Sequence, residues 1–404
     1  MRTILVVCPY VPHPPNHGGS IRSRVLLEAL AQDHRVHVAV PAVAPSVATT
    51  ELDRLAGLAA LGVEPHELPS PTSQRPSVGQ KLRHWLCGSS ELLARRWSPH
   101  AAAALAALRE RLRPDLVVLD STFAVPIWRG AQPVLLHLHN LEHHILQRPS
   151  GAPDRASARL SRAIEAWAIR RTERRALRRA ALAVCVSAAD RTLALQLAPA
   201  TRVEVVPNTI DTTALPPLPP PPPGPPRLLY VGGLDYPPNR DAVRELLTDH
   251  LPVLRAALPG LTVRLVGRDP AGVLRAFAGC AGIEAMGAVG DLRPHYAESH
   301  AVYLPIRSGG GTRIKILEAW ALGRPVLATR IASEGLPAED GVHLRHFVGP
   351  TDGARALREV LAGQDRSLCA AGRQLVAAAF DHGTARRQLR ALAGALVDTL
   401  PGGT

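Results

Sequence analysis

The sequence has 404 residues, of which 46% are hydrophobic and 20% charged. This length and composition predict two globular domains, and they exclude both a small disulfide-stapled scaffold and a disordered chain. The formal net charge of +13 would suit a nucleic acid or an anionic membrane, but an aromatic fraction of 3% offers few platforms for base stacking, so we expect no nucleic-acid partner.

The distribution of apolar residues and cysteines favours a cytoplasmic protein. No apolar run approaches the roughly 20 residues that cross a bilayer. Prolines interrupt the sequence directly after the first apolar run, which is atypical of a secretory signal. The five cysteines are scattered and include no C-x-x-C pair, so we expect neither a disulfide framework nor a zinc site.

Apolar runs typical of buried strands alternate with helical patterns along residues 1–211, which we expect to form the N-terminal domain. The expected strands cover residues 3–8, 36–40, 116–119, 134–138, 182–186 and 203–206. Helical sequence begins at Ser20 and near Ser46, and a long basic helix is predicted over residues 156–180. This βα rhythm predicts a parallel sheet covered by helices.

A proline-rich segment, residues 212–226, is predicted to be an extended linker because proline neither pairs in a sheet nor continues a helix. The βα rhythm then restarts in residues 227–383, which we expect to form a second α/β domain. Its predicted strands cover residues 228–231, 262–266, 301–305 and 325–328. Residues 384–404 form a last predicted helix that could pack back on the first domain.

The basic residues are strongly biased toward arginine. Only two lysines and four asparagines remain, Lys81, Lys315, Asn16, Asn140, Asn208 and Asn239. Such a composition indicates coding bias, so the surviving lysines and asparagines should mark positions at which arginine or aspartate is a poor substitute. We interpret Asn208 as a turn residue and Asn239 as a helix N-cap.

The strongest candidate binding loop is SGGGTRIKILEA, residues 308–319, which follows a predicted strand and opens a helix. Its glycines let backbone N–H groups approach an anion, and the helix start adds a partial positive charge. Arg313 and Lys315 add formal charge, and a carboxylate at Glu318 can accept hydrogen bonds from a ribose diol. We predict a nucleotide diphosphate site formed by Gly309, Gly310, Gly311, Thr312, Arg313, Lys315 and Glu318. The alternative is a glycine turn with an exposed Lys315–Glu318 pair.

Further candidates follow other strands. Gly18 and Gly19 lie at the entrance of the helix predicted from Ser20, where phosphate or sugar could approach, with Arg22 in its first turn. No dinucleotide fingerprint or P-loop is present, which disfavours nicotinamide enzymes and P-loop ATPases. Gly232 and Gly233 follow the first strand of the second half and face the same predicted anion.

A histidine-rich segment follows a predicted strand of the first half and contains His139, Asn140 and Glu142. His139 could contact a sugar or stabilise charge at the reacting centre, and the alternative is a histidine whose ring nitrogens are satisfied by neighbouring groups. The spacing matches no metal motif that we recognise, so we expect no metal.

The segments that carry these residues, among them PYVPHPPNHGGSIRS, HNLEHHI, VVPNTID, LLYVGGLDYPPN, LVGRDP and LPIRSGGGTRIKILEAWALGRPVLAT, resemble the retaining group 1 glycosyltransferases of family 4. The resemblance implies an α/β GT-B fold, with two Rossmann-like domains whose parallel sheets face each other across a cleft. It implies a nucleotide sugar on the C-terminal domain and the acceptor on the N-terminal domain. It assigns Glu318 to the ribose, Lys315 and the glycine loop to the diphosphate, and Arg268 to the donor. It places Arg22, Asn140 and Glu142 on the acceptor side. Gly310 stands where the family usually has a glutamate.

The resemblance implies transfer to an acceptor hydroxyl with retention of configuration, without a metal or a cofactor besides the nucleotide sugar. Catalysis would rest on His139, Lys315 and Arg313. The acceptor could be a glycan, a lipid-linked sugar or a natural product, and a basic helix over residues 155–179 could lie on an anionic membrane. Two alternatives remain open: a non-catalytic subunit that binds nucleotide sugars, and an inverting transferase or epimerase of the same fold.

Overall fold

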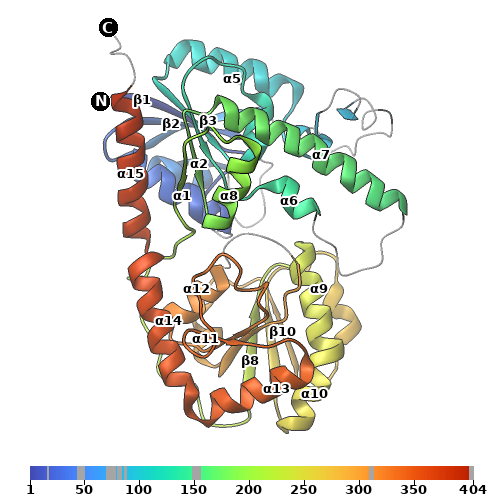
Figure 1. Ribbon diagram of the computed structural model, residues 1–404. Helices are drawn as coiled ribbons and strands as arrows, with labels where there is room; N and C mark the ends of the chain where they lie inside the picture. Colours follow the sequence, from blue (N-terminus) through green and yellow to red (C-terminus); the bar gives the residue numbers. More distant parts are fainter. Residues whose placement is uncertain are drawn as a thin grey trace. The chain divides into compact units, whose positions relative to one another are not determined.

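The computed structural model describes residues 1–15, 18–42, 51–69, 79, 84–85, 89–147, 156–308 and 314–399. The described chain divides into two compact units. Unit 1 contains residues up to Thr209 and the C-terminal segment from His382, and unit 2 contains Ile210–Asp381. Each unit is an α/β structure with its own sheet (Figure 1).

Unit 1 contains a seven-stranded parallel sheet in the order β3-β2-β1-β4-β5-β6-β7. Its strands are β1 (Thr3–Val7), β2 (Arg35–Pro41), β3 (Val63–Leu68), β4 (Leu116–Asp120), β5 (Val134–His137), β6 (Leu182–Cys185) and β7 (Val203–Val205). Its helices are α1 (Gly18–Leu30), α2 (Glu51–Ala59), α4 (Glu91–Ala94), α5 (Pro99–Leu112), η1 (Thr122–Ile127), α6 (Glu142–Gln147), α7 (Ala156–Arg179), α8 (Ala188–Leu197) and α15 (His382–Asp398).

Alternate residues of the central strand supply the two layers of the unit 1 core. In β1, Ile4 and Val6 join one apolar cluster, which includes residues of α1 and α15. Leu5 and Val7 join a second cluster on the opposite face, with residues of α5, α7 and α8. Burial of both faces explains why the central strands are continuous apolar runs.

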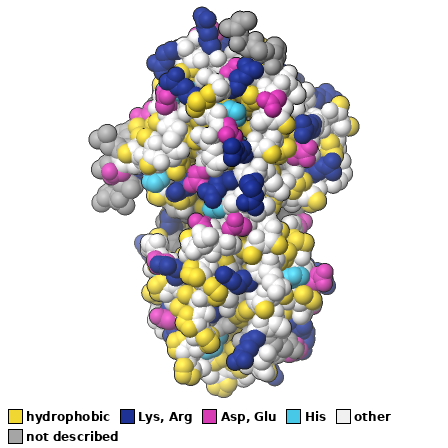
Figure 2. Space-filling view, turned by 90° about the vertical axis from the view of Figure 1, so that its left-hand side faces the viewer, with side chains coloured by type: hydrophobic (Ala, Val, Ile, Leu, Met, Phe, Trp, Pro, Cys, Tyr) yellow, Lys and Arg dark blue, Asp and Glu magenta, His cyan; other side chains and the backbone are white. Residues whose placement is uncertain are grey.

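The C-terminal helix α15 packs beside α1 within unit 1 (Figure 1). Leu389 and Leu396 are buried in the same apolar cluster as Leu26. Arg386 forms an ion pair of 3.0 Å with Glu28, and Arg390 forms one with Asp33. Basic and acidic side chains accordingly lie next to one another on this face of unit 1 (Figure 2). The last segment of the chain is therefore part of unit 1 although it follows unit 2 in the sequence.

Unit 2 contains a six-stranded parallel sheet in the order β10-β9-β8-β11-β12-β13. Its strands are β8 (Arg227–Val231), β9 (Thr262–Val266), β10 (Ile283–Gly287), β11 (Ala301–Leu304), β12 (Val326–Ala328) and β13 (Arg345–His346). Its helices are α9 (Pro237–Glu245), η2 (Leu246–His250), α10 (Leu251–Ala257), η3 (Val273–Phe277), α11 (Arg293–Ala297), α12 (Ile314–Ala321), α13 (Pro350–Glu359), η4 (Val360–Gln364) and α14 (Asp365–Ala379).

The proline-rich segment is packed against unit 2. Leu218 N donates a hydrogen bond of 3.1 Å to Leu322 O, and Arg324 donates one of 2.6 Å to Pro219 O. The division between the units lies upstream of this segment, after Thr209.

Both sheets have the same strand order, with the first strand of the unit in the centre and later strands added on either side. The predicted α/β class with two parallel sheets is confirmed. In such sheets the loops after the two central strands diverge, which opens a crevice at the carboxyl ends of the strands. In unit 1 these central strands are β1 and β4, and in unit 2 they are β8 and β11.

Candidate active site

The crevice position of unit 2 is occupied by Lys315, in the first turn of α12. Its Nζ donates a hydrogen bond of 2.9 Å to Asn239 Oδ1 and lies 4.5 Å from the ring centroid of Tyr230. Tyr230 is in β8, and Asn239 is in α9, the next helix of the chain. The ammonium group is therefore held at the carboxyl end of a central strand by a hydrogen bond and a cation–π contact.

The Asn239 side chain makes hydrogen bonds with Lys315, Tyr230 and Gly233, and it does not cap a helix. Its Nδ2 donates a hydrogen bond of 2.9 Å to Gly233 O, and its Oδ1 also accepts one of 3.0 Å from the Tyr230 hydroxyl. The N-cap residue of α9 is Tyr236, which makes no side-chain capping bond. The predicted N-cap role of Asn239 is wrong, because the residue lies inside the helix and turns its amide toward the loop after β8.

Two glycines allow the strand ends to approach one another closely. A Cβ atom at Gly232 would lie 2.7 Å from Asn239 Nδ2 and 2.8 Å from Lys315 Nζ, and one at Gly267 would lie 2.2 Å from Gly232 O. Both residues have a positive φ, 157° and 151°. The loops after β8 and β9 therefore require glycine at these two positions.

Glu318 lies one turn after Lys315 on α12. Its Oε2 accepts a hydrogen bond of 3.2 Å from the Tyr296 hydroxyl, and its Oε1 makes no hydrogen bond to any described residue. Burial raises the pKa of Glu318 to about 7, although the Tyr296 hydrogen bond and the Lys315 charge act in the opposite direction. A ligand hydroxyl that donates to Oε1 would favour the ionised carboxylate.

Of the other predicted donor residues on this unit, Gly233 joins the cluster, Arg268 forms an exposed ion pair, and the rest lie outside the described residues. Gly309, Gly310, Gly311, Thr312 and Arg313 fall in the segment that the structure does not describe. Arg268 is exposed and forms an ion pair of 2.8 Å with Asp235. Gly233 directly follows Gly232, and its carbonyl holds Asn239.

The crevice position of unit 1 is built around Asp120, a residue that the sequence analysis did not single out. Asp120 ends β4 and is fully buried. Its Oδ1 accepts hydrogen bonds of 2.7 Å from both His137 Nδ1 and His139 Nε2. Its Oδ2 accepts one of 2.5 Å from Ser23 Oγ and lies 3.4 Å from Cys8 Sγ. One carboxylate thus connects the ends of β1, β4 and β5 with helix α1.

These contacts set the charge states in the cluster. Burial alone would raise the pKa of Asp120, but the neighbouring His139 and the two imidazole hydrogen bonds hold it well below its usual range. Burial, followed by the charge of Arg22, lowers the pKa of His137 to about 3. Asp120 is therefore an anion and His137 a neutral hydrogen-bond donor at neutral pH.

His139 is held at both ring nitrogens. Because Nε2 donates to Asp120, Nδ1 is the acceptor for the Tyr10 hydroxyl at 3.2 Å. Tyr10 also lies 3.0 Å from Ser23 Oγ, and the His139 side chain is 10% exposed. The imidazole is thus fixed in one orientation. A ligand that accepts a hydrogen bond from Nε2 would compete with Asp120, and a ligand that donates one to Nδ1 would compete with Tyr10.

Asp120, His137 and His139 also form a set that could hold a metal ion, because their ligand atoms lie within 4.8 Å of one another. A second set of this kind is His37, Glu64 and His66 on β2 and β3. In the first set His137 Nδ1 and His139 Nε2 both approach the same carboxylate oxygen at hydrogen-bond distance, while His137 Nε2 is buried without a partner among the described residues. The expectation that the reaction needs no metal stays a prediction.

Helix α1 of unit 1 contains two predicted donor-binding glycines and the predicted acceptor-side residue Arg22. Gly18 and Gly19 are the first two residues of α1. Arg22 is 5% exposed and donates a hydrogen bond of 2.8 Å from Nη1 to Val206 O, while its Nε and Nη2 have no partner among the described residues. Burial lowers the pKa of Arg22 to about 10. Arg22 is thus an interior residue of α1.

Glu142 begins α6, directly after the end of β5. Its backbone N–H donates a hydrogen bond of 2.7 Å to Glu173 Oε1. Burial, followed by the charge of Glu173, raises the pKa of Glu142 to about 7, and a hydrogen bond from Asn140 opposes this rise. Glu142 is therefore a carboxyl group that exchanges a proton near neutral pH.

Comparison with known proteins identifies the family. The Glycosyltransferase Family 4 model matches residues 17–214, and the model of Glycosyl transferases group 1 matches residues 225–363. The chain is a group 1 glycosyltransferase of family 4. The two matches fall on either side of the proline-rich segment, so each unit of this glycosyltransferase corresponds to one family model. No curated protein matches the sequence.

Solved structures show the same GT-B fold for the glycosyltransferase. Sucrose-phosphate synthase from Thermosynechococcus elongatus is 19% identical with a TM-score of 0.70, and the match covers 98% of this chain and 100% of that one. Anabaena Alr3699/HepE in complex with UDP-glucose is 15% identical with a TM-score of 0.66 and the same coverage. TarM of S. aureus is 9% identical with a TM-score of 0.66 and 99% coverage of both chains. The predicted GT-B class is confirmed.

Proposed function

We propose that this glycosyltransferase moves a sugar from a nucleotide-sugar donor to an acceptor hydroxyl with retention of anomeric configuration and without a divalent metal. The observation that carries the proposal is the cradle formed by Lys315, Asn239, Tyr230 and Gly232 at the crevice position of unit 2. A fixed cation beside a glycine-lined loop and a helix start suits a diphosphate. The complexes of Anabaena HepE with UDP-glucose and of TarM with UDP support a nucleotide-sugar donor.

In the proposed reaction the bond from the anomeric carbon to the diphosphate oxygen breaks, and a bond to the acceptor oxygen forms on the same face. The acceptor proton passes to an oxygen of the leaving diphosphate, so no separate base is required. The charge that develops on the leaving group is stabilised by Lys315, with Arg313 and backbone N–H groups of the glycine loop assigned the same role. Glu318 Oε1 would accept a hydrogen bond from the ribose.

His139 is assigned to the reacting sugar, with Asn140, Glu142 and Arg22 on the acceptor side. The rigid pairing of His139 with Asp120 supports a positioning task, because an imidazole locked at both nitrogens loses little entropy when a sugar packs against it. Gly18 and Gly19 at the start of α1 are assigned to a phosphate or sugar oxygen.

Incubation of the enzyme with UDP-, GDP-, ADP- and dTDP-sugars tests the donor class. A donor should raise the melting temperature of the wild type and release nucleotide slowly in the absence of acceptor. Proton NMR of the product then gives its anomeric configuration, and an inverted product would contradict retention. Full turnover in EDTA is expected, and loss of turnover that Mg²⁺ or Mn²⁺ restores would contradict the metal-free mechanism.

We further propose that α7 contacts an anionic membrane that carries the acceptor. Among the described residues, no helix is long and apolar enough to cross a bilayer. Helix α7 nevertheless exposes Leu160 (63%) and Trp167 (49%) beside its arginines. Exposed apolar residues next to cations suit the interface of an anionic bilayer. Flotation with phosphatidylglycerol vesicles should show binding that weakens at high salt, and absence of binding at low salt would contradict this contact.

A further inference from the structure

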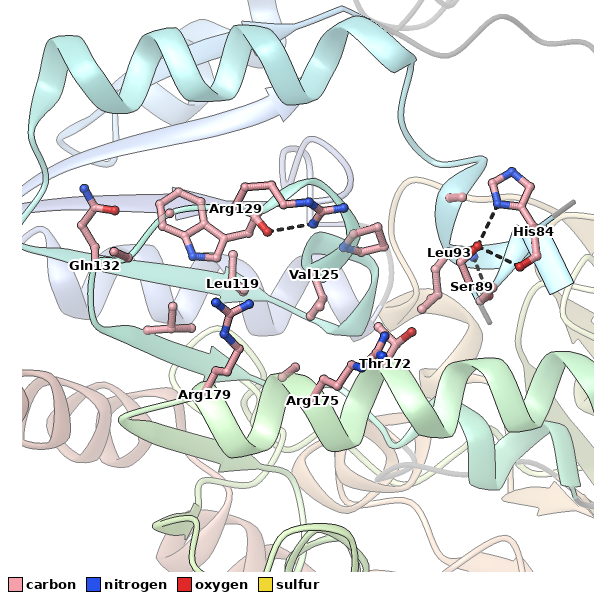
Figure 3. Close-up of a pocket in the computed structure, with 18 residues that line it drawn as sticks. His84, Ser89, Leu93, Leu119, Val125, Arg129, Gln132, Thr172, Arg175 and Arg179 are labelled. Carbon is pink, nitrogen blue, oxygen red and sulfur yellow. Dashed lines mark hydrogen bonds between the residues drawn. The ribbon is translucent and has the colours of Figure 1, made fainter. Parts of the chain in front are cut away.

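A cavity of about 540 Å³ lies in unit 1 between α7 and the segment that joins η1 to β5. Its size is within the range of roughly 300 to 1,000 Å³ that is usual for small-molecule sites. Arg175 and Arg179 rise from α7 on one side, and Arg129 and Gln132 come from the opposite wall (Figure 3). Neither the Lys315 cluster nor the Asp120 cluster contributes a lining residue.

The charged side chains that line the cavity are all positive. Its described lining contains three arginines, Arg129, Arg175 and Arg179, and no aspartate or glutamate. The acidic residues of α7 are engaged elsewhere, since Glu165 accepts hydrogen bonds from Trp85 and Ser90, and Glu173 accepts from Thr122 and His143. Within the described part of the chain, Arg175 and Arg179 form no ion pair. The cavity is therefore suited to an anion.

The cavity also has an apolar floor and two polar groups without partners. Leu93, Leu119, Val125 and Val134 line it together with the Trp128 ring. Trp128 Nε1 and Gln132 Oε1 are buried and have no hydrogen-bond partner among the described residues. Buried polar atoms are normally satisfied by protein, water or ligand. The lining residues thus include one unpartnered hydrogen-bond donor, Trp128 Nε1, and one unpartnered acceptor, Gln132 Oε1, in addition to the apolar side chains.

We propose that this cavity binds an amphiphilic phosphate, that is, a phosphate head group joined to a hydrocarbon chain. The arginines would bind the phosphate oxygens and the apolar floor would hold the first part of the chain. The exposed residues Leu160 and Trp167 lie on the same helix as Arg175 and Arg179, so such a ligand could enter from a lipid surface. The site is separate from the proposed donor site, and its occupancy does not depend on glycosyl transfer.

Isothermal titration without nucleotide sugar tests the proposal. The probes are decyl phosphate at concentrations at which it stays monomeric, decyl glucoside as the uncharged amphiphile, and inorganic phosphate as the head group alone. Decyl phosphate should bind with one-to-one stoichiometry, and each of the other two probes should bind at least about tenfold more weakly. Equal affinity for decyl glucoside or for inorganic phosphate would overturn the amphiphile assignment.

The chain offers a matched pair of double variants. Arg175→Ala/Arg179→Ala removes two arginines that line the cavity, whereas Arg174→Ala/Arg178→Ala removes two that do not line it. All four are exposed on the same helix, and the two pairs have the same spacing and charge. The first variant should weaken decyl phosphate binding by about tenfold or more, because it removes two charge-assisted hydrogen-bond donors to the phosphate. The second should change it by less than about twofold. Equal losses in both variants would show that the ligand binds the basic surface of α7 and would refute a cavity site.

Discussion

Replacement of Lys315 by alanine is expected to lower the kcat of glycosyl transfer by about a hundredfold or more while the enzyme stays folded. Lys315 is the described cation at the crevice position of unit 2, and its Nζ is fixed by Asn239 and by the Tyr230 ring. Loss of one preorganised electrostatic partner of a developing oxyanion typically costs about 2.7 to 4 kcal/mol in the barrier. This cost corresponds to about a hundredfold to a thousandfold in rate.

The cost to folding should be much smaller. Removal of the ammonium group leaves Asn239 Oδ1 with its hydrogen bond from the Tyr230 hydroxyl and Asn239 Nδ2 with its bond to Gly233 O. Both polar atoms of the Asn239 amide therefore keep a hydrogen bond. The lost cation–π contact and hydrogen bond together account for about 1 to 2 kcal/mol of the free energy of unfolding.

The assay measures nucleotide release and product formation for the wild type, Lys315→Ala, Lys315→Arg and Arg275→Ala. Arg275 is an exposed cation of unit 2 away from the cluster, so its loss should leave kcat within about twofold of the wild type. Arginine at position 315 should restore little, because a planar guanidinium is larger than the ammonium group that donates to Asn239 Oδ1 beside the Tyr230 ring and cannot reproduce its position. Turnover of Lys315→Ala at a near-normal rate would refute the electrostatic role.

Three further substitutions test other parts of the structure. Asp120→Asn should lower the free energy of unfolding by about 3 kcal/mol or more, measured by urea denaturation, because one amide cannot accept every hydrogen bond that the buried carboxylate receives from His137, His139 and Ser23. Glu318 has a pKa of about 7 in the folded state, against an ordinary value of 4.5. The folded state therefore binds this proton more tightly than the unfolded state does. As the pH rises from 4.5 to about 7, the residue should lower the free energy of unfolding by at most about 3 kcal/mol. Glu318→Gln should remove this part of the pH dependence in urea titrations, and an unchanged slope would contradict the shift. Gly267→Ala should lower the melting temperature and abolish donor binding, because its Cβ would lie 2.2 Å from Gly232 O, whereas Gly290→Ala, which meets no atom within 4 Å, should change neither.

The sequence predicted the central strands well and the edge strands poorly. Strands such as β1 and β4 are buried on both faces, so their apolar runs are unmistakable. The strands β3, β10 and β13 were not predicted, and all three lie at sheet edges. Their sequences, VEPHEL, IEAMG and RH, contain proline or charged residues, because an edge strand is only partly buried. Hydrophobic periodicity therefore carries little signal at these positions.

The scarcity of lysine and asparagine was a useful signal in unit 2. Lys315 and Asn239, two of the rare residues, form a direct hydrogen bond although they are separated by 76 positions in the sequence. The sequence identified both residues but not their contact. Only the strand order shows that α9 and α12 begin at the carboxyl ends of neighbouring strands, β8 and β11. The role assigned to Asn239 was wrong for the same reason: local sequence suggests a cap, and the tertiary contact decides the conformation.

Asp120 shows what a single sequence conceals. It ends the apolar run LVVLD and looks like an ordinary polar residue at a strand terminus. The available signal was its position, because a carboxylate at the end of a central strand faces the crevice if β4 neighbours β1. The strand order was needed to use this signal, and the strand order is not visible in the local pattern.

The electrostatics of the two crevice positions support donor binding by unit 2. The unit 1 position contains the anionic Asp120, and the neighbouring Arg22 directs its Nη1 to a backbone carbonyl inside the unit. A diphosphate placed against Asp120 would meet a like charge, whereas at Lys315 it would meet an ammonium whose named contacts are the neutral Asn239 and Tyr230. Because both units share one strand order, the fold alone does not distinguish them. The two positions differ in the sign of the charge at the end of the central strands, and this difference supports our proposal that the phosphates bind beside α12.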